Sequence, residues 1–409
     1  MPRQHSRRHF LAASAALPYA LRAMAEPVVS GGQQWLLVGT GTDKGIFRTP
    51  FDPGSGVLGN FEVAAQTPHP TFLALHPTLP FLYAANEIPE GDGQISSFKL
   101  ERANGNLSEL AQAGTEGNGA CYVSLDHTGR MAFAANYGGG SVALMDIVGD
   151  GEFDNTQLFD CKTNLACGIP GPVKNRQEAP HMHCAVVSPD NHFVLSCDLG
   201  GDGIEIFPIA PKRGPKPRAN WQTQDDSKPP PPQRGPTRVS TRPGSGPRHL
   251  AFHPDGHLVY CIHELDCTLQ AFNWSVRGGA PVLEPIVDTI ISTLPKGMTP
   301  LADSTKPNTA CEVAISPNGK SLYANTRGAN TLAVYAIDSH TGILTEQQRI
   351  QTGGESTRHF AFDPSRRWLL CANQGSSTIT VFSHDTSTGK LGEIPKIYPL
   401  DTPMFIQFI

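Results

Sequence analysis

The sequence predicts an all-β protein, a seven-bladed β-propeller made of four-stranded antiparallel blades. Three observations support this architecture. A strand–turn–strand pattern recurs six times, its period is close to the length of a propeller blade, and the two ends of the chain are complementary. The composition agrees, because 41 Gly, 36 Pro and only 17% charged residues suit short strands joined by turns.

Each copy of the pattern is an apolar strand, a four-residue turn and a second apolar strand, which is typical of a β-hairpin. The six copies are "TFLALHPTLPFLYAANE", "CYVSLDHTGRMAFAANY", "HCAVVSPDNHFVLSCDL", "RHLAFHPDGHLVYCIHE", "CEVAISPNGKSLYANTR" and "RHFAFDPSRRWLLCANQ". A third strand such as "SVALMDI" follows most of them. The turn anchors are spaced by 50, 62, 65, 63 and 47 residues, at Pro77, His127, Pro189, Pro254, Pro317 and Pro364. Units of about 45–50 residues match one blade, and insertions account for the longer units.

The ends of the chain predict how the ring closes. "WLLVGT" and "GIFRTPF" near the N-terminus read as second and third strands without a first, and "MFIQFI" at the C-terminus reads as a lone strand. Together they would form a seventh blade and leave no open sheet edge. We therefore expect one propeller domain over residues 26–409, with a tandem of β-sandwiches as the alternative. A basic, Pro-rich insertion at about residues 211–247 is expected to be a solvated loop, or else a lid.

Residues 1–25 predict export. Arg7-Arg8 precede Phe10-Leu11 and a short apolar stretch that ends in "AMA", a pattern typical of a twin-arginine signal peptide. A disordered basic tail is the alternative. The signal predicts a bacterial protein that is periplasmic or secreted, with no membrane insertion after cleavage. The net charge of −5 gives no footprint of nucleic acid, and we expect a monomer or weak dimer.

The cysteines and histidines of the chain are candidates for disulfide bonds and for metal binding. Nine cysteines leave at least one unpaired, and disulfides Cys161–Cys167 and Cys184–Cys197 or reduced buried thiols are the two expectations. The chain has no CxxC motif, which argues against structural zinc. His181 and His183 would share one face of a strand, but they lack a clear third ligand, so we expect no metal and no cofactor.

The repeat predicts which polar residues gather in space. The start of the first strand and the end of the second should lie on the same face of each blade, near the central channel. The strand-start residues are Thr71, Cys121, His183, Arg248, Cys311 and Arg358. The strand-end residues are Glu87, Tyr137, Leu199, Glu264, Arg327 and Gln374. The residues directly before them are, in the same order, Asn86, Asn136, Asp198, His263, Thr326 and Asn373. These sets predict a funnel with three arginines, at least two carboxylates and several imidazoles.

Such a funnel suits the binding of an anionic substrate, although a polar lining that only solvates the channel is the alternative. His and Glu side chains could transfer protons there. His249 follows Arg248 directly, so on a regular strand it should point the opposite way and support the site from behind. The chain has no GxSxG elbow and no GxxxxGK[ST] loop, which excludes the usual α/β-hydrolase and P-loop sites.

Four segments resemble the seven-bladed lactonase propellers: "PHMHCAVVSPDN", "GSGPRHLAFHPDGHLVYCIHE", "CEVAISPNGKSLYANTRG" and "RHFAFDPSRRWLLCANQGSSTITVF". This family includes the propeller type of 6-phosphogluconolactonase and the fungal carboxy-cis,cis-muconate cyclase. The resemblance extends from "LLVGTGTDKGIF" to "FIQFI" and implies the propeller fold as well.

The resemblance implies catalytic roles for His183, Arg248, Glu264 and Arg327. Because "ANTRG" stands here in place of the family's usual "SNRG", Arg327 is shifted by one residue in the simplest alignment. His181 is the alternative active imidazole. The residues expected to bind substrate are His181, Glu87, Asn136, Arg358 and Asn373.

The predicted function is hydrolysis of a small anionic, sugar-type lactone by activated water, without a covalent intermediate. Arg248 and Arg327 would hold the anion and the developing oxyanion, and Glu264 or His183 would activate the water. The alternatives are a muconate-type cycloisomerase that uses the same residues and a non-catalytic propeller that binds a ligand or a partner protein. Export argues for a substrate other than the phosphorylated lactone of the cytoplasmic pentose pathway.

Overall fold

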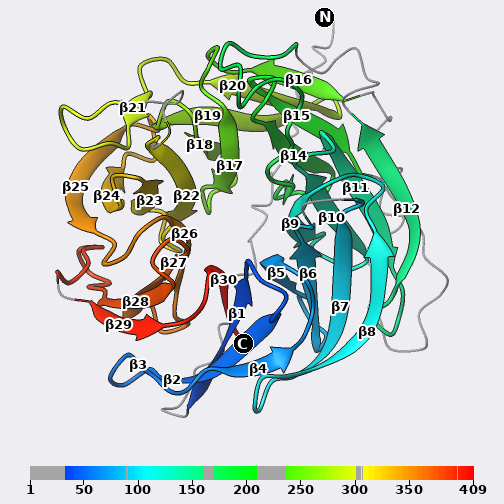
Figure 1. Cartoon of the computed structure of the whole chain (residues 1–409). Helices are drawn as coiled ribbons and strands as arrows, with labels where there is room; N and C mark the ends of the chain where they lie inside the picture. The colour runs from blue at the N-terminus through cyan, green and yellow to red at the C-terminus, as the bar shows by residue number, and fades with distance from the viewer. Residues whose placement is uncertain are drawn as a thin grey trace, which may run out of the picture. The chain divides into compact units, whose positions relative to one another are not determined.

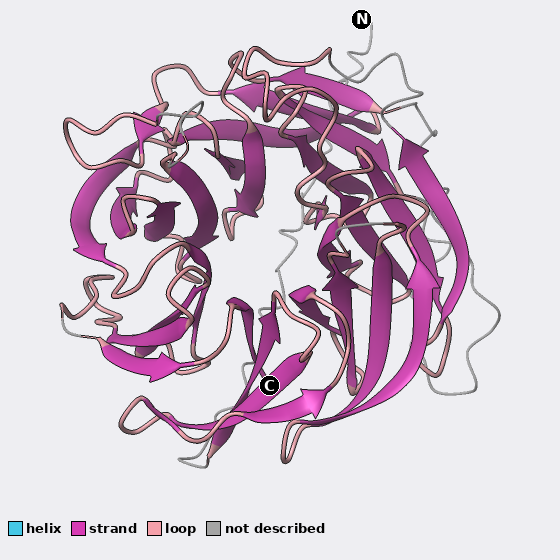
Figure 2. Ribbon diagram, in the orientation of Figure 1, coloured by secondary structure: helices cyan, strands magenta, loops and turns pink. Residues whose placement is uncertain are grey.

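The computed structural model describes residues 33–88, 91–160, 169–209, 236–300, 305, 307–393 and 395–409. All of them belong to one compact unit, Gly31–Ile409. The predicted signal at residues 1–25, the Cys161–Cys167 pair and most of the Pro-rich insertion lie outside the described residues. The described chain consists of strands, turns and loops (Figure 2). It contains no helix with the length and apolar character needed to cross a membrane.

The strands form seven antiparallel sheets arranged as blades around a central axis, which confirms the predicted propeller (Figure 1). Six blades are each built from consecutive strands. The first three of these contain β5 (Pro70–Leu75), β6 (Phe81–Asn86), β7 (Gln94–Glu101) and β8 (Asn106–Gly114); β9 (Ala120–Leu125), β10 (Met131–Asn136), β11 (Ser141–Ile147) and β12 (Phe153–Asp160); and β13 (Val186–Val187), β14 (Phe193–Asp198), β15 (Gly203–Pro208) and β16 (Thr237–Ser240). The next three contain β17 (Pro247–Phe252), β18 (Leu258–His263), β19 (Thr268–Arg277), β20 (Ala280–Pro285) and β21 (Ile291–Ser292); β22 (Thr309–Ile315), β23 (Ser321–Arg327), β24 (Thr331–Ile337) and β25 (Leu344–Gln351); and β26 (Thr357–Phe362), β27 (Trp368–Asn373), β28 (Thr378–Ser383) and β29 (Lys396–Pro399).

The seventh blade joins the two ends of the chain, as the sequence predicts. It contains β1 (Gln34–Thr40), β2 (Ile46–Asp52), β3 (Val57–Leu58), β4 (Glu62–Ala65) and the C-terminal β30 (Pro403–Phe408). The inner strand β30 pairs with β1, with Leu37 opposite Gln407 and Val38 opposite Ile406. Because β30 covers the free edge of β1, the ring has no open inner edge at this point.

The hairpin turns explain the recurring Pro/Asp/Gly signal. Between β17 and β18, the backbone N of Gly256 donates to the carbonyl O of His253 at 2.8 Å. The φ of Gly256 is +75°, a left-handed conformation that glycine adopts without a Cβ clash. At the equivalent positions of two other blades, Asn191 and Arg366 adopt φ values of 59° and 60°.

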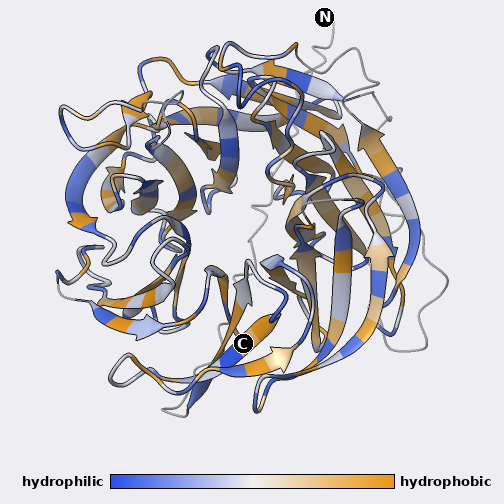
Figure 3. Cartoon of the chain, viewed as in Figure 1, coloured by the Kyte–Doolittle hydropathy of each residue, from blue (hydrophilic) through white to orange (hydrophobic). Residues whose placement is uncertain are grey.

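The core is divided among the spaces between blades. Seven hydrophobic clusters of the described residues each join two neighbouring sheets. In one of them Leu195 and Ile204 pack against Val259, Phe272 and Trp274 of the next blade. The strands carry most of the strongly hydrophobic stretches (Figure 3). Since each sheet buries both faces against neighbours, the alternative tandem of sandwiches is excluded.

Two expectations about the chain's details need correction. Cys184 and Cys197 are free thiols buried in the core, so the predicted disulfide between them is wrong. A reduced thiol packs there as a small apolar group. The seven cysteines among the described residues are all free and buried. Strand β16 lies inside the range expected for the Pro-rich loop: Val239 packs on the core there, and Arg238 pairs with the buried Glu205.

A β-bulge in the inner strand of most blades decides which side chains face the channel. In β17, Pro247 pairs with His263 and His249 pairs with Ile262, so Arg248 is an extra residue without a partner. The same one-residue shift occurs in β5, β9, β22, β26 and the pairing of β30 with β1. A bulge redirects the strand locally, so two consecutive side chains can point to the same side.

Candidate active site

Glu264, which directly follows β18, is the centre of a cluster of charged residues. Its Oε2 accepts a hydrogen bond from Arg248 Nε at 2.9 Å and lies 3.0 Å from Arg327 Nη2. Its Oε1 accepts one from Arg176 Nη2 at 2.6 Å. Arg248 and Glu264 are only 1% and 2% exposed. The structure therefore brings together three of the predicted residues and adds a fourth, Arg176.

The hairpin geometry explains the three predicted members of this cluster. Arg248 is the extra residue of the bulge near the start of β17, and the backbone N of Glu264 donates to the carbonyl O of Gly246 at 2.7 Å. Arg327 is the last residue of β23 in the next blade. Strand starts and strand ends thus lie at the same end of the channel, as the antiparallel hairpins require.

Arg176 was missed because it lies outside the repeat, in the connection between β12 and β13. It also donates to the hydroxyl of Tyr137 at 3.3 Å. One signal could have found it. The anchors His127 and Pro189 are 62 residues apart, and the surplus includes "GPVKNRQEAP" directly before His181.

The electrostatics keep Glu264 ionised. Burial alone would raise the pKa of its carboxyl group. The charges of the three surrounding arginines outweigh burial and hold that pKa well below its ordinary range. Three positive charges face one negative charge, so two are not neutralised within the cluster. Among the described residues, the buried Nε of Arg327 has no hydrogen-bond partner.

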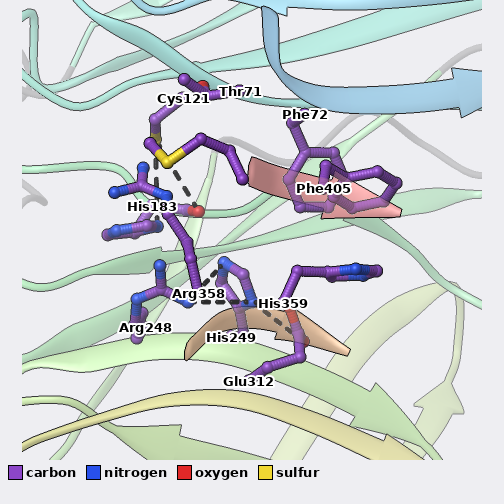
Figure 4. A pocket seen from close by; sticks show the side chains of 11 residues that line it. Thr71, Phe72, Cys121, His183, Arg248, His249, Glu312, Arg358, His359 and Phe405 are labelled. Carbon is purple, nitrogen blue, oxygen red and sulfur yellow. Dashed lines mark hydrogen bonds and ion pairs between the residues drawn. The ribbon is translucent and has the colours of Figure 1, made fainter. Parts of the chain in front are cut away.

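A cavity that is partly open to solvent adjoins the cluster through Arg248; its volume is about 210 Å³ with the open space included. Figure 4 shows Phe72 and Phe405 on one side of it and His183 and Arg248 on the other. Its lining consists of Thr71, Phe72, Cys121, His183, Arg248, His249, Glu312, Arg358, His359, Met404 and Phe405.

His249 points into this cavity, so the expectation that it points away from the channel is wrong. The bulge at Arg248 breaks the alternation on which that expectation depended. His249 Nδ1 lies 3.1 and 3.2 Å from the two carboxylate oxygens of Glu312. Figure 4 shows His249 between Arg248 and Glu312.

His183 lines the same cavity just before β13. Its ring lies 5.2 Å from that of His249 and 5.5 Å from that of Tyr137, centroid to centroid. Its Nδ1 lies 3.9 Å from Cys121 Sγ. Burial, reinforced by the charge of Arg248, holds the pKa of His183 well below its ordinary value, so the ring is neutral at pH 7.

His181 occupies a different position from His183. Its Nδ1 lies 2.9 Å from the carbonyl O of Tyr137, and its Nε2 lies 3.0 Å from Glu178 Oε1. The ring stacks on Tyr137 at 4.4 Å. With both nitrogens engaged, this imidazole supports Tyr137 and the loop that carries Arg176.

The remaining predicted binding residues fall into two groups. Arg358 lines the cavity and donates to Glu87 Oε2 at 2.7 Å, which joins the start of β26 to the end of β6. Asn136 and Asn373 are fully buried. Asn136 donates to Ser141 at 3.0 Å and to the carbonyl O of Thr115 at 3.2 Å, and Asn373 donates to Thr378 at 3.3 Å. Neither asparagine lines the cavity.

No metal centre is evident in this part of the molecule. Among the described residues, no three His, Cys, Asp or Glu side chains converge so as to hold a metal ion.

The fold and site together define a class: a seven-bladed propeller with a cationic, imidazole-lined pocket on its central axis. Comparison with known proteins identifies the family. Residues 35–408 match the family model described as "Lactonase, 7-bladed beta-propeller", and the chain belongs to this family. Its membership makes it a lactonase-type enzyme.

Named relatives agree with this membership. The 6-phosphogluconolactonase of Bacillus subtilis (strain 168) is 26% identical over 325 residues, covering 80% of this chain and 83% of that protein. The 6-phosphogluconolactonase of Formosa agariphila is 28% identical over 337 residues, covering 81% and 86%. The solved structure of a periplasmic gluconolactonase from Pseudomonas aeruginosa has a TM-score of 0.78 and 28% identity, covering 92% of this chain and 99% of that one.

Proposed function

We propose that this chain hydrolyses a small anionic, sugar-type lactone. The observation that carries the proposal is the cluster of Arg176, Arg248 and Arg327 around the single carboxylate of Glu264. Purely structural pairing needs one cation for one carboxylate, whereas three cations surround Glu264 here. The ionised Glu312 offsets part of this excess through Arg248, and the remainder is available to an anionic ligand. Arginine matches carboxylate and phosphate oxygens with paired, planar N–H donors.

Arg248 and Arg327 are suited to hold the substrate and its developing oxyanion. Arg248 lines the cavity and is fixed by Glu264 and by the carbonyl O of Cys311, to which its Nη1 donates at 2.6 Å. Arg327 keeps an unpartnered Nε among the described residues. Donors held in place before the reaction stabilise developing charge most effectively. Glu264 is then a positioning residue.

The proton acceptor in this proposal is an imidazole. The three arginines make Glu264 a weak base, because they hold the pKa of its carboxyl far below neutral pH. His183 is a buried imidazole that is neutral at pH 7, so its ring has an unprotonated nitrogen that can accept a proton.

Direct attack by water, without a covalent intermediate, also fits the lining. The thiol that lines the cavity belongs to Cys121, and burial raises the pKa of that thiol well above its ordinary value. A thiol that stays protonated is a poor nucleophile. The site therefore supplies cations and a base, and water supplies the nucleophile.

The test is incubation of the purified protein with a panel of carboxylated and phosphorylated sugar lactones and, in parallel, with muconate-type diacids. We expect the lactones to be consumed with release of one acid equivalent per ring. Consumption of the diacids alone would show a cycloisomerase, and no turnover of either panel would show a non-catalytic propeller. Either of these outcomes overturns the proposal.

We also propose that the enzyme works outside the cytoplasm as a monomer or weak dimer. The Arg7-Arg8 pattern and the periplasmic location named for the Pseudomonas aeruginosa relative support this. Its natural substrate would then differ from a phosphorylated cytoplasmic lactone. Subcellular fractionation tests the location, with recovery in the cytoplasm contradicting it, and sedimentation of the purified protein tests the oligomeric state.

A further inference from the structure

We propose that His249 and Glu312 form the proton-accepting dyad of this site, with His249 Nε2 as the atom that takes a proton from the hydrolytic water. The proposal rests on the lactone hydrolysis proposed above and deepens it. It gives a catalytic role to His249, which the sequence places behind the site, and a positioning role to Glu312, which lies outside the predicted set.

The contacts of the dyad determine which nitrogen is available. Both carboxylate oxygens of Glu312 lie within 3.2 Å of His249 Nδ1, and Oε1 also accepts a hydrogen bond from the backbone N of Val313 at 3.0 Å. Burial alone would raise the pKa of Glu312, but the interaction with His249 outweighs it and lowers that pKa to about 2. An ionised carboxylate only accepts, so Nδ1 carries the ring proton and Nε2 keeps its lone pair. Arg248 Nη1 lies 3.2 Å from this Nε2 and 3.3 Å from Nδ1, so the hydrolytic water must take the place of Arg248 beside Nε2.

The other imidazoles of the funnel are less suited to this role. The backbone N of Ile406 donates to His359 Nδ1 at 3.3 Å, so the neutral His359 ring carries its proton on Nε2 and acts there as a donor. Both nitrogens of His181 lie beside oxygen acceptors, and His181 does not line the cavity. His183 has Cys121 Sγ beside Nδ1, where His249 has a buried carboxylate.

The surroundings of His249 keep it neutral before the reaction. The titratable and charged groups that face it are Tyr122, His183, Arg248, Glu312, Arg358 and His359. Burial lowers the pKa of His249 below its ordinary value, Glu312 opposes this shift and the Arg248 charge adds to it. The net result is a neutral ring at pH 7 whose protonated form Glu312 stabilises once the proton arrives.

The reaction step is balanced with water as the co-reactant. His249 Nε2 removes one proton from the water while the water oxygen bonds to the lactone carbonyl carbon, and the negative charge develops on the carbonyl oxygen near Arg248. The ring C–O bond then breaks, and the proton returns from Nε2 to the departing alkoxide oxygen. The product is the open hydroxy acid, and His249 is neutral again.

The experiment compares kcat and pH profiles of wild-type, His249→Gln and Glu312→Gln proteins on the lactone that the wild type opens fastest. We expect His249→Gln to lower kcat by about 10²- to 10⁴-fold. We expect Glu312→Gln to lower kcat and to move the acidic limb of the profile by about one pH unit or more toward lower pH, because the carboxylate that stabilises the imidazolium is lost. His257→Ala, an exposed histidine in the turn after β17, is the matched control and should match the wild type.

The outcomes separate the two proposals. A wild type that opens no lactone overturns the proposed function and the dyad with it. An active wild type with undiminished kcat in folded His249→Gln, or with an unmoved acidic limb in Glu312→Gln, overturns the dyad alone. If the buried substitutions prevent folding, the wild-type protein is used for the test. Its imidazole ¹⁵N NMR spectrum must then show a histidine that carries its proton on Nδ1 and titrates below pH 6.5. The same titration must coincide with the acidic limb of the activity profile. Constant activity from pH 7 to pH 4 contradicts the dyad.

Discussion

Arg176 Nη2 lies 2.6 Å from Glu264 Oε1, although 88 residues separate them in the chain. This contact ties a loop outside the repeat to the charged cluster on the propeller axis. The loop therefore contributes a residue to the charged cluster and is more than a connection between two blades.

Replacing Arg176 by Ala should weaken substrate capture, because the cluster loses part of its surplus positive charge. We expect kcat/KM to fall about 10- to 100-fold, or about 1.4–2.8 kcal/mol, mostly through KM. Arg176→Lys keeps the charge and should recover part of the loss. Steady-state kinetics at low and high salt measure the effect, and an unchanged KM in Arg176→Ala would remove this arginine from the site.

Glu264 should make the folded state sensitive to acid. Its pKa is depressed in the folded protein, so its contribution to stability is present above the unfolded value of about 4.3 and is lost as pH falls toward the folded value. We expect Glu264→Gln to be destabilised by about 3–5 kcal/mol at pH 7, because three arginines lose their shared carboxylate. The difference from wild type should shrink below about pH 4. Urea titrations at pH 7 and pH 3.5 measure it, and a constant difference at both pH values would contradict this account.

Removing residues 403–409 should prevent formation of the stable propeller. The truncation deletes β30 and exposes the inner edge of β1, which favours aggregation through strand pairing. We expect loss of the cooperative thermal transition and soluble aggregates in gel filtration. Gln407→Ala, which keeps the strand, is the control and should change stability by about 0.5 kcal/mol or less. A truncated protein with wild-type Tm would show that ring closure is dispensable.

The seven cysteines in the described part of the chain should react with thiol reagents only after unfolding. All are buried and free, and burial raises the pKa of Cys121 and Cys267, the latter to about 12. Mass spectrometry after alkylation of the native and the urea-unfolded protein checks this. A disulfide between Cys184 and Cys197, or rapid labelling of either in the native state, would be incompatible with the structure.

Sequence reasoning predicted the parts of the molecule that repeat. The blade count, the closing blade and the meeting of Arg248 with Glu264 all follow from one hairpin copied around a ring. Arg176 has no counterpart in the repeat, so alignment of the copies could not reveal it. The direction of His249 depends on a bulge, and strict alternation along a strand has no means of predicting one. Asn136 shares its register with channel residues, yet its amide bonds to Ser141 and to the backbone of Thr115, and it does not line the cavity.

The recurring bulge also affects how such a site can change over time. The extra residue pairs with no neighbour in the ladder, so its identity does not set the register of the blade. Across the ring this position holds residues as different as Thr71, Cys121, Arg248, Arg358 and Met404 within one regular scaffold. The propeller therefore offers several independently exchangeable positions around a single cavity, and its substrate preference could be altered one blade at a time without rebuilding the sheets.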